Sequence, residues 1–377
     1  MIRTLLLIVA CIVALYALKK LASILWRDPL NRKKLQRFKS IKRGYWSFLF
    51  FIALLLMSVF GELVVNSRAL LVRYEGKFHF PTYADMIPGK EFGLGYDYET
   101  NYRELAARIA DKGNDPDEAT GDFVLMPPVP YNAFETEERD DVYPPFAPSL
   151  ADKHYLGTDS VGRDIGARLF YGFRIAISFA LVLLACTYVV GIALGCIMGY
   201  FGGLFDLLFQ RIIEIWSAIP FLYVVIIVAA VFPPSFPILV SIVVLFGWMG
   251  MTWYMRTATY KEATREYVLA ARALGASRTR IIFSHILPNT VSIIVTFIPF
   301  AISSGIVTLT SLDYLGYGLP PPTPSWGELI DQGMNHLDDK WIIASVLAAM
   351  IIVLTTVTFI GEAVREAFDP KQHTTYQ

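Results

Sequence analysis

Long runs of apolar residues, separated by polar and often basic segments, form the main pattern along this chain. A hydrocarbon core about 30 Å thick requires around 20 apolar residues per helix, so a run of that length predicts a helix that crosses a membrane. The runs predict six such helices, near residues 46–65, 174–199, 212–232, 238–256, 289–311 and 341–361. The expected fold class is therefore an all-α polytopic membrane protein.

A shorter apolar run over residues 4–18 predicts an additional transmembrane helix within residues 1–26. Lys19 and Lys20 follow this run and can extend their amino groups to the membrane surface. A helix lying in the interface and a cleaved signal sequence remain as alternatives, and the pair Ala10-Cys11 would suit a lipoprotein. Processing is disfavoured because a single arginine precedes the run and no good small-residue cleavage site follows it.

Composition supports a membrane protein, and the distribution of charge orients it. Hydrophobic residues make up 55% of the chain and charged residues 18%, a balance that a soluble domain with a polar surface would not keep. Residues 19–43 carry ten basic side chains against Asp28, and residues 256–288 carry six against two acidic ones. Short basic loops stay in the cytoplasm, so both segments and the C-terminus are expected inside, with the N-terminus outside.

Residues 66–165 form a polar, acidic insertion that is expected outside. An alternating stretch over residues 72–80 with Glu75-Gly76 at its centre predicts a β-hairpin, and Tyr102 to Lys112 has helical spacing. The insertion has too little apolar content for a large core of its own, so we expect it to fold against the outer ends of the spans or a partner subunit. A carboxylate cluster could bind a cation or a basic peptide, although a solvated acidic loop is favoured. Its members are Glu135, Glu137, Glu138, Asp140 and Asp141.

The basic segment between the fourth and fifth predicted spans contains a short helix with a glycine stop and a proline restart. Leu269, Ala270, Ala273 and Leu274 recur at helical spacing and form a small apolar face. Gly275 follows where a helix readily takes a left-handed terminal residue. Pro288 is expected to begin the next helix. The pattern favours a docking element over residues 265–276, and an ordinary connector remains the alternative.

Two further segments carry dense turn residues next to predicted spans. Residues 156–174 contain Asp159 and Asp164, which can cap helix starts, and Arg163, Arg168 and Arg174, which are expected at the membrane interface. A substrate contact and a purely structural role both remain open for these side chains.

The second segment, residues 315–328, has glycines and prolines that predict a rigid, non-helical crossing. Trp326 is a suitable interface anchor there.

Chemical motifs are scarce in this sequence. It has no Gly-x-x-x-x-Gly-Lys-Ser/Thr phosphate loop, no His-Glu-x-x-His and no Gly-x-Ser-x-Gly, and its five histidines have no metal-ligand spacing. Cys11, Cys186 and Cys196 lie in apolar runs, which suggests packing rather than a disulfide or zinc site. We therefore expect no catalytic residue, no metal and no cofactor in this chain, and no nucleic-acid partner.

The helix, glycine and proline pattern resembles the EAA loop of bacterial ABC importer permeases. Ala270, Ala271, Gly275, Leu287 and Pro288 fall in register, whereas Leu269 occupies the usual glutamate position and His285 the usual isoleucine position. The two turn-rich segments are similar to outer signatures of the peptide and nickel importer permeases. The residues that carry this second similarity are Gly157, Thr158, Asp159, Gly162, Arg163, Asp164, Gly316, Gly318, Pro324, Trp326 and Gly327.

The matches cover roughly residues 150–370, and the insertion further resembles the Yej-type permeases linked to oligopeptide and microcin C uptake. The resemblance implies a type I ABC importer transmembrane domain with a small mixed α+β periplasmic insertion. Its implied parts are an additional N-terminal helix (1–26), a basic cytoplasmic loop (27–44), a transmembrane helix (45–65), the periplasmic insertion (66–165) and a core of five transmembrane helices (166–377) with a cytoplasmic coupling loop (257–288).

The implied function is that of a non-catalytic permease subunit in a bacterial inner membrane that moves oligopeptides or microcin C type compounds into the cytoplasm. The implied partners are a second permease subunit in a heterodimer, two ABC ATPase domains that bind ATP and Mg, a periplasmic peptide-binding protein and the lipid bilayer. A dipeptide or nickel importer is the nearest alternative. An ion-driven secondary transporter or channel and an intramembrane enzyme are alternatives of different classes.

Overall fold

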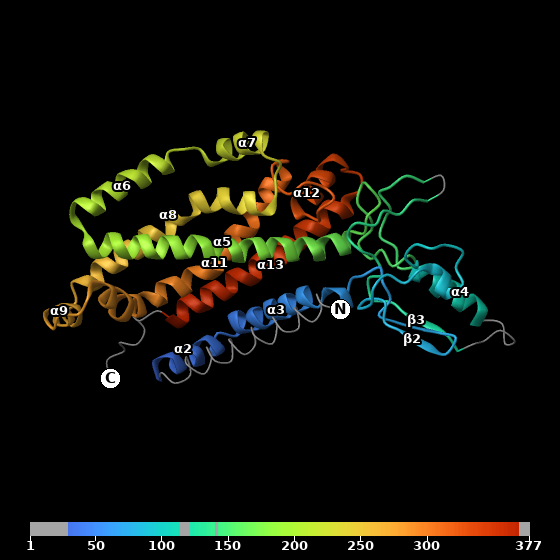
Figure 1. The fold of residues 1–377 in the computed structure, drawn as a ribbon, viewed down its shortest axis with the longest axis horizontal. Coiled ribbons are helices and arrows are strands. Elements are labelled where there is room, and N and C mark those ends of the chain that lie inside the picture. Colours follow the sequence, from blue (N-terminus) through green and yellow to red (C-terminus); the bar gives the residue numbers. More distant parts are fainter. Residues whose placement is uncertain (1–28, 114–120, 140–141, 369–377) are drawn as a thin grey trace. The chain divides into compact units, whose positions relative to one another are not determined.

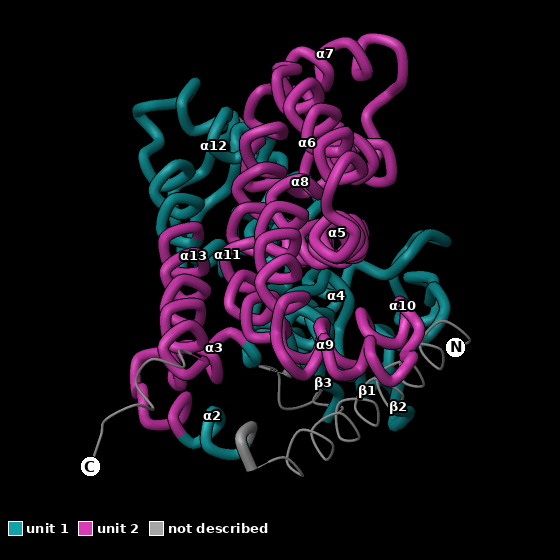
Figure 2. Tube along the Cα trace, turned by 90° about the vertical axis from the view of Figure 1, so that its left-hand side faces the viewer, with its two compact units in different colours: residues 1–36, 52–173, 329–349 teal, residues 37–51, 174–328, 350–377 magenta. Residues whose placement is uncertain are grey.

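The computed structural model describes residues 29–113, 121–139 and 142–368, and the predicted helix within residues 1–26 lies outside this part. The chain forms two compact units (Figure 2). Unit 1 contains the described parts of residues 1–36, 52–173 and 329–349, and unit 2 those of 37–51, 174–328 and 350–377.

Apolar helices make up most of the described chain (Figure 1). Five runs of helix are long and apolar enough to cross a membrane: α3 (Lys42–Val59), α5 (Ile165–Phe201), α8 (Phe236–Ala263), the continuous run Arg278–Tyr314 that ends in α11 (Leu287–Tyr314), and α13 (Lys340–Phe368). The expectation of a polytopic helical protein is confirmed. A basic helix, α2 (Pro29–Ser40), precedes α3.

The prediction of a single helix at residues 212–232 is wrong. The structure has two helices there, α6 (Gly203–Ser217) and α7 (Phe221–Val231), which meet at a bend of 68°. Pro220 explains the break, because a proline lacks the N–H for an intrahelical bond and disfavours helical geometry at the residue before it. The pair counts as one further candidate span if it crosses the membrane as a unit.

Close packing of small residues joins α5 to α8 in unit 2. A Cβ at Gly191 would approach the Trp248 carbonyl oxygen to 2.8 Å, and one at Gly195 would approach the Thr252 carbonyl oxygen to 2.7 Å. Small residues at a spacing of four let two helix backbones approach closely. This supports packing as the role of these glycines, and Cys196 is buried beside them as expected.

The segment after α8 begins its next helix earlier than predicted. After α9 (Glu266–Ala273), Ser277 Oγ accepts a hydrogen bond from the Arg280 N–H, and the chain runs through α10 (Arg278–Arg280) and the π-helical segment η3 (Ile281–Ile286) into α11. Pro288 lies in the first turn of α11, as predicted, but α11 continues a helical run that already begins at Arg278. The π turn directly before Pro288 supplies the local adjustment that a residue without an N–H requires.

The insertion in unit 1 contains the predicted hairpin and helix. Strands β1 (Leu71–Tyr74) and β2 (Lys77–His79) pair antiparallel, α4 covers Tyr102–Gly113, and a short strand not predicted, β3 (Phe123–Leu125), pairs with the other edge of β1. Two short 3-10 turns, η1 (Gly61–Leu63) and η2 (Gly89–Phe92), lie before β1 and between β2 and α4.

This insertion has a small core of its own, and its folding against the outer ends of the spans or a partner subunit stays a prediction. The buried members are Ala69, Val72, Ile87, Phe92, Leu94, Tyr102 and Leu105. Their number matches a three-stranded sheet covered by one helix, which is the least that a separate core requires.

Candidate functional site

Helix α9 ends in a Schellman motif, which fixes where this short helix stops. The Gly275 N–H donates to the Arg272 carbonyl and the Ala276 N–H to the Ala271 carbonyl, both at 3.0 Å. Gly275 has a φ of +80°, and nothing lies within 4 Å of a Cβ placed there. The backbone conformation is thus the reason for glycine at this position, as the sequence predicted.

Two groups of contacts hold α9 in place. Val268 is fully buried against Ile281 and Ile286 of η3. The Tyr267 hydroxyl donates to Glu262 Oε2 at 2.6 Å and accepts from Asn289 Nδ2 at 3.2 Å. Burial and the Glu262 carboxylate raise the pKa of Tyr267 to about 12, so the hydroxyl stays a donor at neutral pH. Sequence inspection missed Val268 and Tyr267, since both depend on contacts with η3 and α11.

The predicted apolar face of α9 is exposed in this chain. Leu274 is 88% and Leu269 49% exposed, and Ala270 and Ala273 lie on the same open surface. Ala271 and Leu287 are half-buried, Pro288 is exposed, and the His285 carbonyl accepts from Asn289. Helix α9 thus exposes one apolar face while its other side is anchored to the rest of unit 2. An exposed apolar face of this kind suits the binding of another protein.

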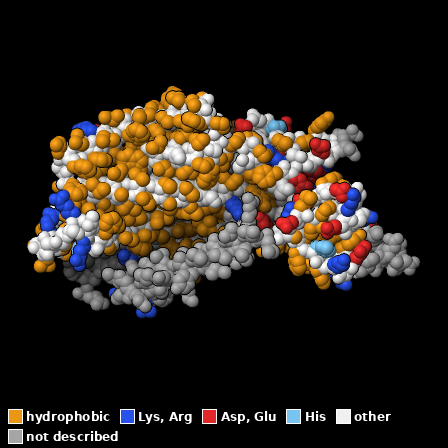
Figure 3. All heavy atoms as spheres, viewed as in Figure 1, with side chains coloured by type: hydrophobic (Ala, Val, Ile, Leu, Met, Phe, Trp, Pro, Cys, Tyr) orange, Lys and Arg blue, Asp and Glu red, His pale blue; other side chains and the backbone are white. Residues whose placement is uncertain are grey.

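Cationic side chains surround this element. The Arg272 guanidinium lies 5.5 Å from the Tyr200 ring centre, and that of Arg278 lies 5.4 Å from the Phe201 ring centre. Figure 3 shows Lys and Arg side chains gathered at the end of unit 2 where Figure 1 places α9. These cation–π contacts tie the segment around α9 to the end of α5.

The first outer signature forms a tight buried turn immediately before α5. Asp159 Oδ1 accepts from the N–H groups of Val161 and Arg163, and its Oδ2 pairs with the Arg163 guanidinium at 2.7 Å. Arg168 lies 3.4 Å from the same oxygen and donates to the Ala133 carbonyl. Asp159 therefore stabilises the turn and does not cap a helix, contrary to expectation.

The arginines of this segment were also predicted in the wrong place. Arg163 is 5% exposed and Arg168 is fully buried, so neither anchors the membrane interface, and only Arg174 of the three is partly exposed. A buried guanidinium needs a paired carboxylate, which Asp159 provides for both. Two glycines complete the turn, since a Cβ at Gly157 or Gly162 would meet a carbonyl oxygen at 2.7 or 2.6 Å.

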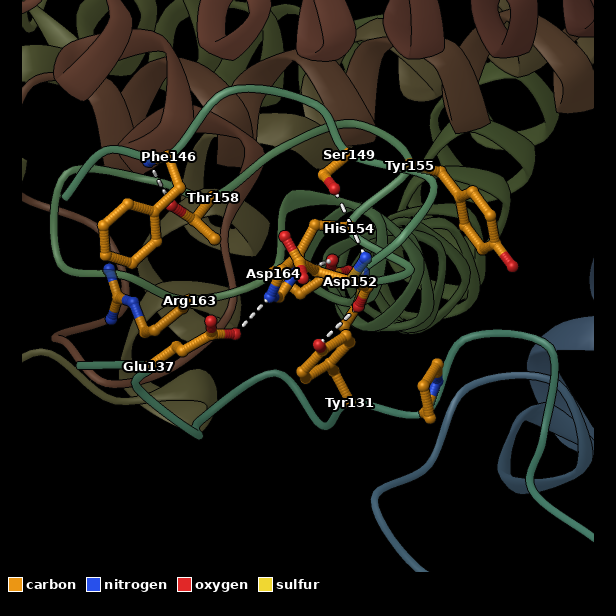
Figure 4. A network of polar contacts seen from close by, with 12 residues as sticks. Tyr131, Glu137, Phe146, Ser149, Asp152, His154, Tyr155, Thr158, Arg163 and Asp164 are labelled. Carbon is orange, nitrogen blue, oxygen red and sulfur yellow. Dashed lines mark hydrogen bonds and ion pairs between the residues drawn. The ribbon is translucent and has the colours of Figure 1, made fainter. Parts of the chain in front are cut away.

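The same turn brings together a charged network that sequence analysis did not find. His154 is 1% exposed, with Nδ1 2.7 Å from Asp164 Oδ2 and Nε2 2.5 Å from Glu137 Oε2 (Figure 4). The Tyr131 ring stacks on the imidazole at 3.9 Å, and Arg139 pairs with Glu137 at 2.7 Å.

The network also reaches the membrane-spanning helix. Asp164 Oδ1 accepts from the Ala167 N–H at 2.7 Å, so Asp164 caps α5 as predicted and binds His154 with its other oxygen. Burial opposes the charge of His154, but the bonds to Asp164 and Glu137 outweigh it and raise the pKa of His154. Burial likewise disfavours ionised Glu137, yet His154 and Arg139 lower its pKa overall. Both shifts favour the charged forms.

The acidic cluster predicted as a solvated loop is therefore partly built into structure. Glu135 pairs with Arg103, and Glu137 belongs to the His154 network. Glu138 is exposed, and Asp140 and Asp141 lie outside the described residues. Among the residues that the structure describes, no group of three His, Cys, Asp or Glu side chains is placed to hold a metal ion.

The second outer signature is organised by Asp313 at the end of α11. Its carboxylate accepts from the Leu319 N–H at 2.8 Å and from the Ser325 hydroxyl at 2.5 Å, and Ser325 Oγ in turn accepts from the Gly327 N–H at 3.1 Å. A Cβ at Gly318 would overlap the Asp313 side chain, and one at Gly327 would overlap the Thr310 carbonyl. Gly316, with a φ of +78°, begins this loop.

The predicted interface role of Trp326 is wrong. Trp326 is 3% exposed and begins α12 (Trp326–Asn335), a short helix that the sequence did not indicate, and Pro324 before it is also buried. The loop packs its large residues inward because Asp313 and Ser325 draw both of its ends together. The non-helical crossing that was expected ends at Ser325.

A groove of about 500 Å³ lies among α5, α7, α8 and α11 in unit 2. Its lining is mostly aromatic and aliphatic, with hydroxyl groups that include Thr187, Tyr188, Tyr254, Ser304 and Thr308. Such a surface can accommodate a neutral or amphipathic molecule or pack against another helix.

Comparison with known proteins gives a consistent result. Residues 191–374 match the family described as the binding-protein-dependent transport system inner membrane component. The chain is 40% identical to the peptidoglycan transport system permease protein YejE of Agrobacterium fabrum, over 92% of this chain and 94% of that protein. It is 39% identical to the inner membrane ABC transporter permease protein YejE of Escherichia coli, over 92% and 98%. It is 34% identical to the dipeptide transport system permease protein DppC of Lactococcus lactis, over 69% and 76%.

Proposed function

The chain belongs to the family of binding-protein-dependent transport system inner membrane components, and we propose that it moves oligopeptides or peptide-like compounds of the microcin C type across a bacterial inner membrane. The extent of the similarity to permeases of this kind carries the peptide class of substrate, and the microcin C type compound is the finer part of the proposal, which rests on the sequence resemblance. Matches to the two YejE permeases cover 92% of the chain, whereas the match to DppC covers 69%.

Family membership agrees with what the sequence predicted about fold. The chain is a multi-pass membrane permease of the type I importer class, mostly helical, with a small three-stranded sheet in an insertion. It is a permease component of an ABC importer for peptides. Hydrolysis of ATP by separate subunits, a second permease, a periplasmic binding protein and the bacterial inner membrane are parts of the proposal.

In this proposal α9 is the coupling helix that sits in a groove of an ATPase subunit. Its open face of Leu269, Ala270, Ala273 and Leu274 supports this role, because the face is apolar and the helix beneath it is anchored by Val268. Closure of the ATPase domains on ATP moves α9, and the membrane helices rearrange from inward-facing to outward-facing. Hydrolysis resets them.

The first outer signature segment and the groove are proposed to act in transport itself, and not in binding the ATPase subunits. The turn that contains Gly157, Thr158, Asp159, Gly162, Arg163 and Asp164 holds the start of α5 rigid through buried ion pairs. In the proposal, the groove lined by Tyr188, Tyr254 and Ser304 faces either the substrate's route through the membrane or the partner permease. Its hydroxyl groups and lack of charged lining residues suit the neutral backbone of a peptide.

Reconstitution tests this function directly. The chain is co-purified with its partner permease and ATPase subunits and placed in proteoliposomes. The proteoliposomes are supplied with the binding protein and with labelled peptides of two to ten residues, a microcin C type compound, peptidoglycan fragments or nickel. We expect ATP-dependent uptake of peptides or peptide-like compounds. Uptake of dipeptides or nickel alone would favour the nearest alternative, and uptake driven by an ion gradient without ATP would contradict the proposal.

A further inference from the structure

A partly buried ion pair links two helices of unit 2 near α9. Arg256 on α8 donates from Nε to Asp206 Oδ1 and from Nη2 to Oδ2, each at 2.5 Å. Gln210, one turn further along α6, donates to Oδ2 at 2.8 Å. The two charged side chains are only 11% and 24% exposed. A two-bond guanidinium–carboxylate contact fixes relative orientation as well as distance, which a single contact does not.

The position of the pair in the chain connects it to the docking element. Asp206 lies in the first turn of α6, just after the left-handed turn Gly202-Gly203 that ends α5. Arg256 lies on α8, which ends at Ala263 and leads within two residues into α9. The pair therefore joins the start of α6 to the helix that carries α9.

Neighbouring contacts make this end of unit 2 one block. Tyr200 packs on the Val268 cluster beneath α9, and Arg272 and Arg278 contact the Tyr200 and Phe201 rings. A Cβ at Gly199 would overlap the Arg256 carbonyl, so α5 and α8 touch backbone to backbone at the level of the ion pair. In Figure 1 α9 lies at the same end of unit 2 as the turn between α5 and α6.

We propose that Asp206 and Arg256 are positioning residues that carry movement of α9 through α8 into the bent pair α6–α7. The inference rests on the proposed function, in which α9 moves with an ATPase subunit. The contacts at Tyr200 and Phe201 carry the same movement into α5. The far end of α6 keeps its own link to α8, because Trp216 Nε1 donates to the Leu245 carbonyl at 2.8 Å. Without the ion pair, the first turn of α6 no longer follows α8 and α9, so ATP is hydrolysed without transport.

An exposed ion pair on the same helix provides a matched control. Arg211 and Glu214 of α6 form an ion pair whose side chains are 72% and 49% exposed. Asp206→Asn keeps the shape of the side chain and removes its charge, and Glu214→Gln does the same at the surface. In proteoliposomes that contain the complete complex, uptake per ATP hydrolysed is measured for each variant together with the amount of ATPase subunit that co-purifies.

We expect Asp206→Asn to retain its ATPase subunits and to lower uptake per ATP about tenfold, within the range typical of coupling between sites. Glu214→Gln should match the wild type. Because removing one partner of a buried pair can also prevent assembly, Asp206→Asn/Arg256→Gln and the exchanged pair Asp206→Arg/Arg256→Asp are measured as well, and the exchanged pair should recover part of the coupling.

Normal uptake per ATP in every assembled variant overturns the inference, as does failure of all three Asp206 variants to assemble, which would make the pair purely structural. The wild-type complex separates this test from that of the proposed function. If the wild type shows no ATP-dependent uptake, the proposed function fails. If the wild type shows ATP-dependent uptake and the variants have the same uptake per ATP, the positioning role is wrong and the proposed function stands.

Discussion

At the scale of single residues, local chemistry was predictable and long-range pairing was not. Asp164 precedes a long apolar run, so its capping role follows from sequence, and the left-handed Gly275 follows from its place after a short helix. His154 gave no signal because its partners Glu137 and Asp164 lie 17 and 10 residues away in sequence. Arg163 and Arg168 were placed at the interface because the nearby Asp159 was read as a cap rather than as their partner.

The charge on His154 makes the outer turn sensitive to pH. Its folded pKa is raised, so its contribution to stability is fully present below the unfolded value near 6.5 and is lost as pH rises through the folded value. The folded pKa of Glu137 is lowered, so its contribution is present above about 4.5 and is lost as pH falls. The two together predict greatest stability between roughly pH 4.5 and 6.5.

His154→Gln should abolish the loss of stability on the alkaline side of that range. It should also destabilise the protein by about 3 kcal/mol, because Asp164 is left buried without its partner. Thermal unfolding of the purified protein from pH 5 to 9 measures both effects. His79→Gln, at a histidine of the same unit that packs on Phe92, should keep the pH dependence. An unchanged pH profile in His154→Gln would contradict the assignment.

At the scale of elements, periodicity predicted the existence of helices better than their ends. The hairpin around Glu75-Gly76, the helix α4 and the long spans follow from alternation and apolar length. The break at Pro220 was overlooked because residues 212–232 are apolar on both sides of it. The start of α11 agrees with the prediction at Pro288 to within one residue, whereas the helical run that leads into it, capped by Ser277, carries no such signal in the sequence. Strand β3 and helix α12 were missed because they are short.

Gly275→Val should weaken docking of the ATPase subunit without preventing insertion of the protein. A β-branched residue at a φ of +80° costs about 1–2 kcal/mol, and since the surrounding space is open this strain is the whole effect. Binding of the purified ATPase subunit to the permease in nanodiscs measures it as an affinity reduced roughly tenfold.

Two controls separate docking from general damage. Gly275→Asn should bind nearly as well as the wild type, because asparagine tolerates the left-handed conformation. Gly76→Val places the same strain, at a φ of +77°, in the hairpin turn of unit 1 and should leave ATPase affinity unchanged. Wild-type affinity in Gly275→Val would remove α9 from the docking site.

At the scale of the whole molecule, the distribution of basic residues predicts which segments lie on each side of the membrane, and labelling of single cysteines tests this orientation. In a variant without native cysteines, Tyr143→Cys should react with an impermeant thiol reagent in intact cells, because Tyr143 is 91% exposed and the insertion is expected outside. Arg280→Cys, in the short helix α10 that follows α9, should react only after the cells are permeabilised. The reverse pattern would overturn the orientation given by the positive-inside rule.

The insertion offers the last test, because the buried members of its small core all lie between Ala69 and Leu105. Val65 and Val129 form a β-bridge, and the Asn66 N–H donates to the Val129 carbonyl at 3.1 Å, so the two ends of the inserted fold leave from adjacent points. Residues 70–127 can therefore be replaced by a short glycine-serine bridge that keeps Glu137, His154 and Asp164. The bridge removes Arg103, and with it the ion pair to Glu135 and the contact with the Tyr131 ring.

We expect the shortened permease to insert, to keep its ATPase subunits and to take up peptide roughly tenfold less well, as for the loss of a contact worth about 1.4 kcal/mol with the binding protein. A larger deletion of residues 70–145 would remove Glu137 and the Ala133 carbonyl that Arg168 binds, and should also destabilise the start of α5. Undiminished uptake after the smaller deletion would show that the insertion does not help to bind the periplasmic binding protein. Loss of ATPase assembly after it would show that the insertion supports the transmembrane fold itself.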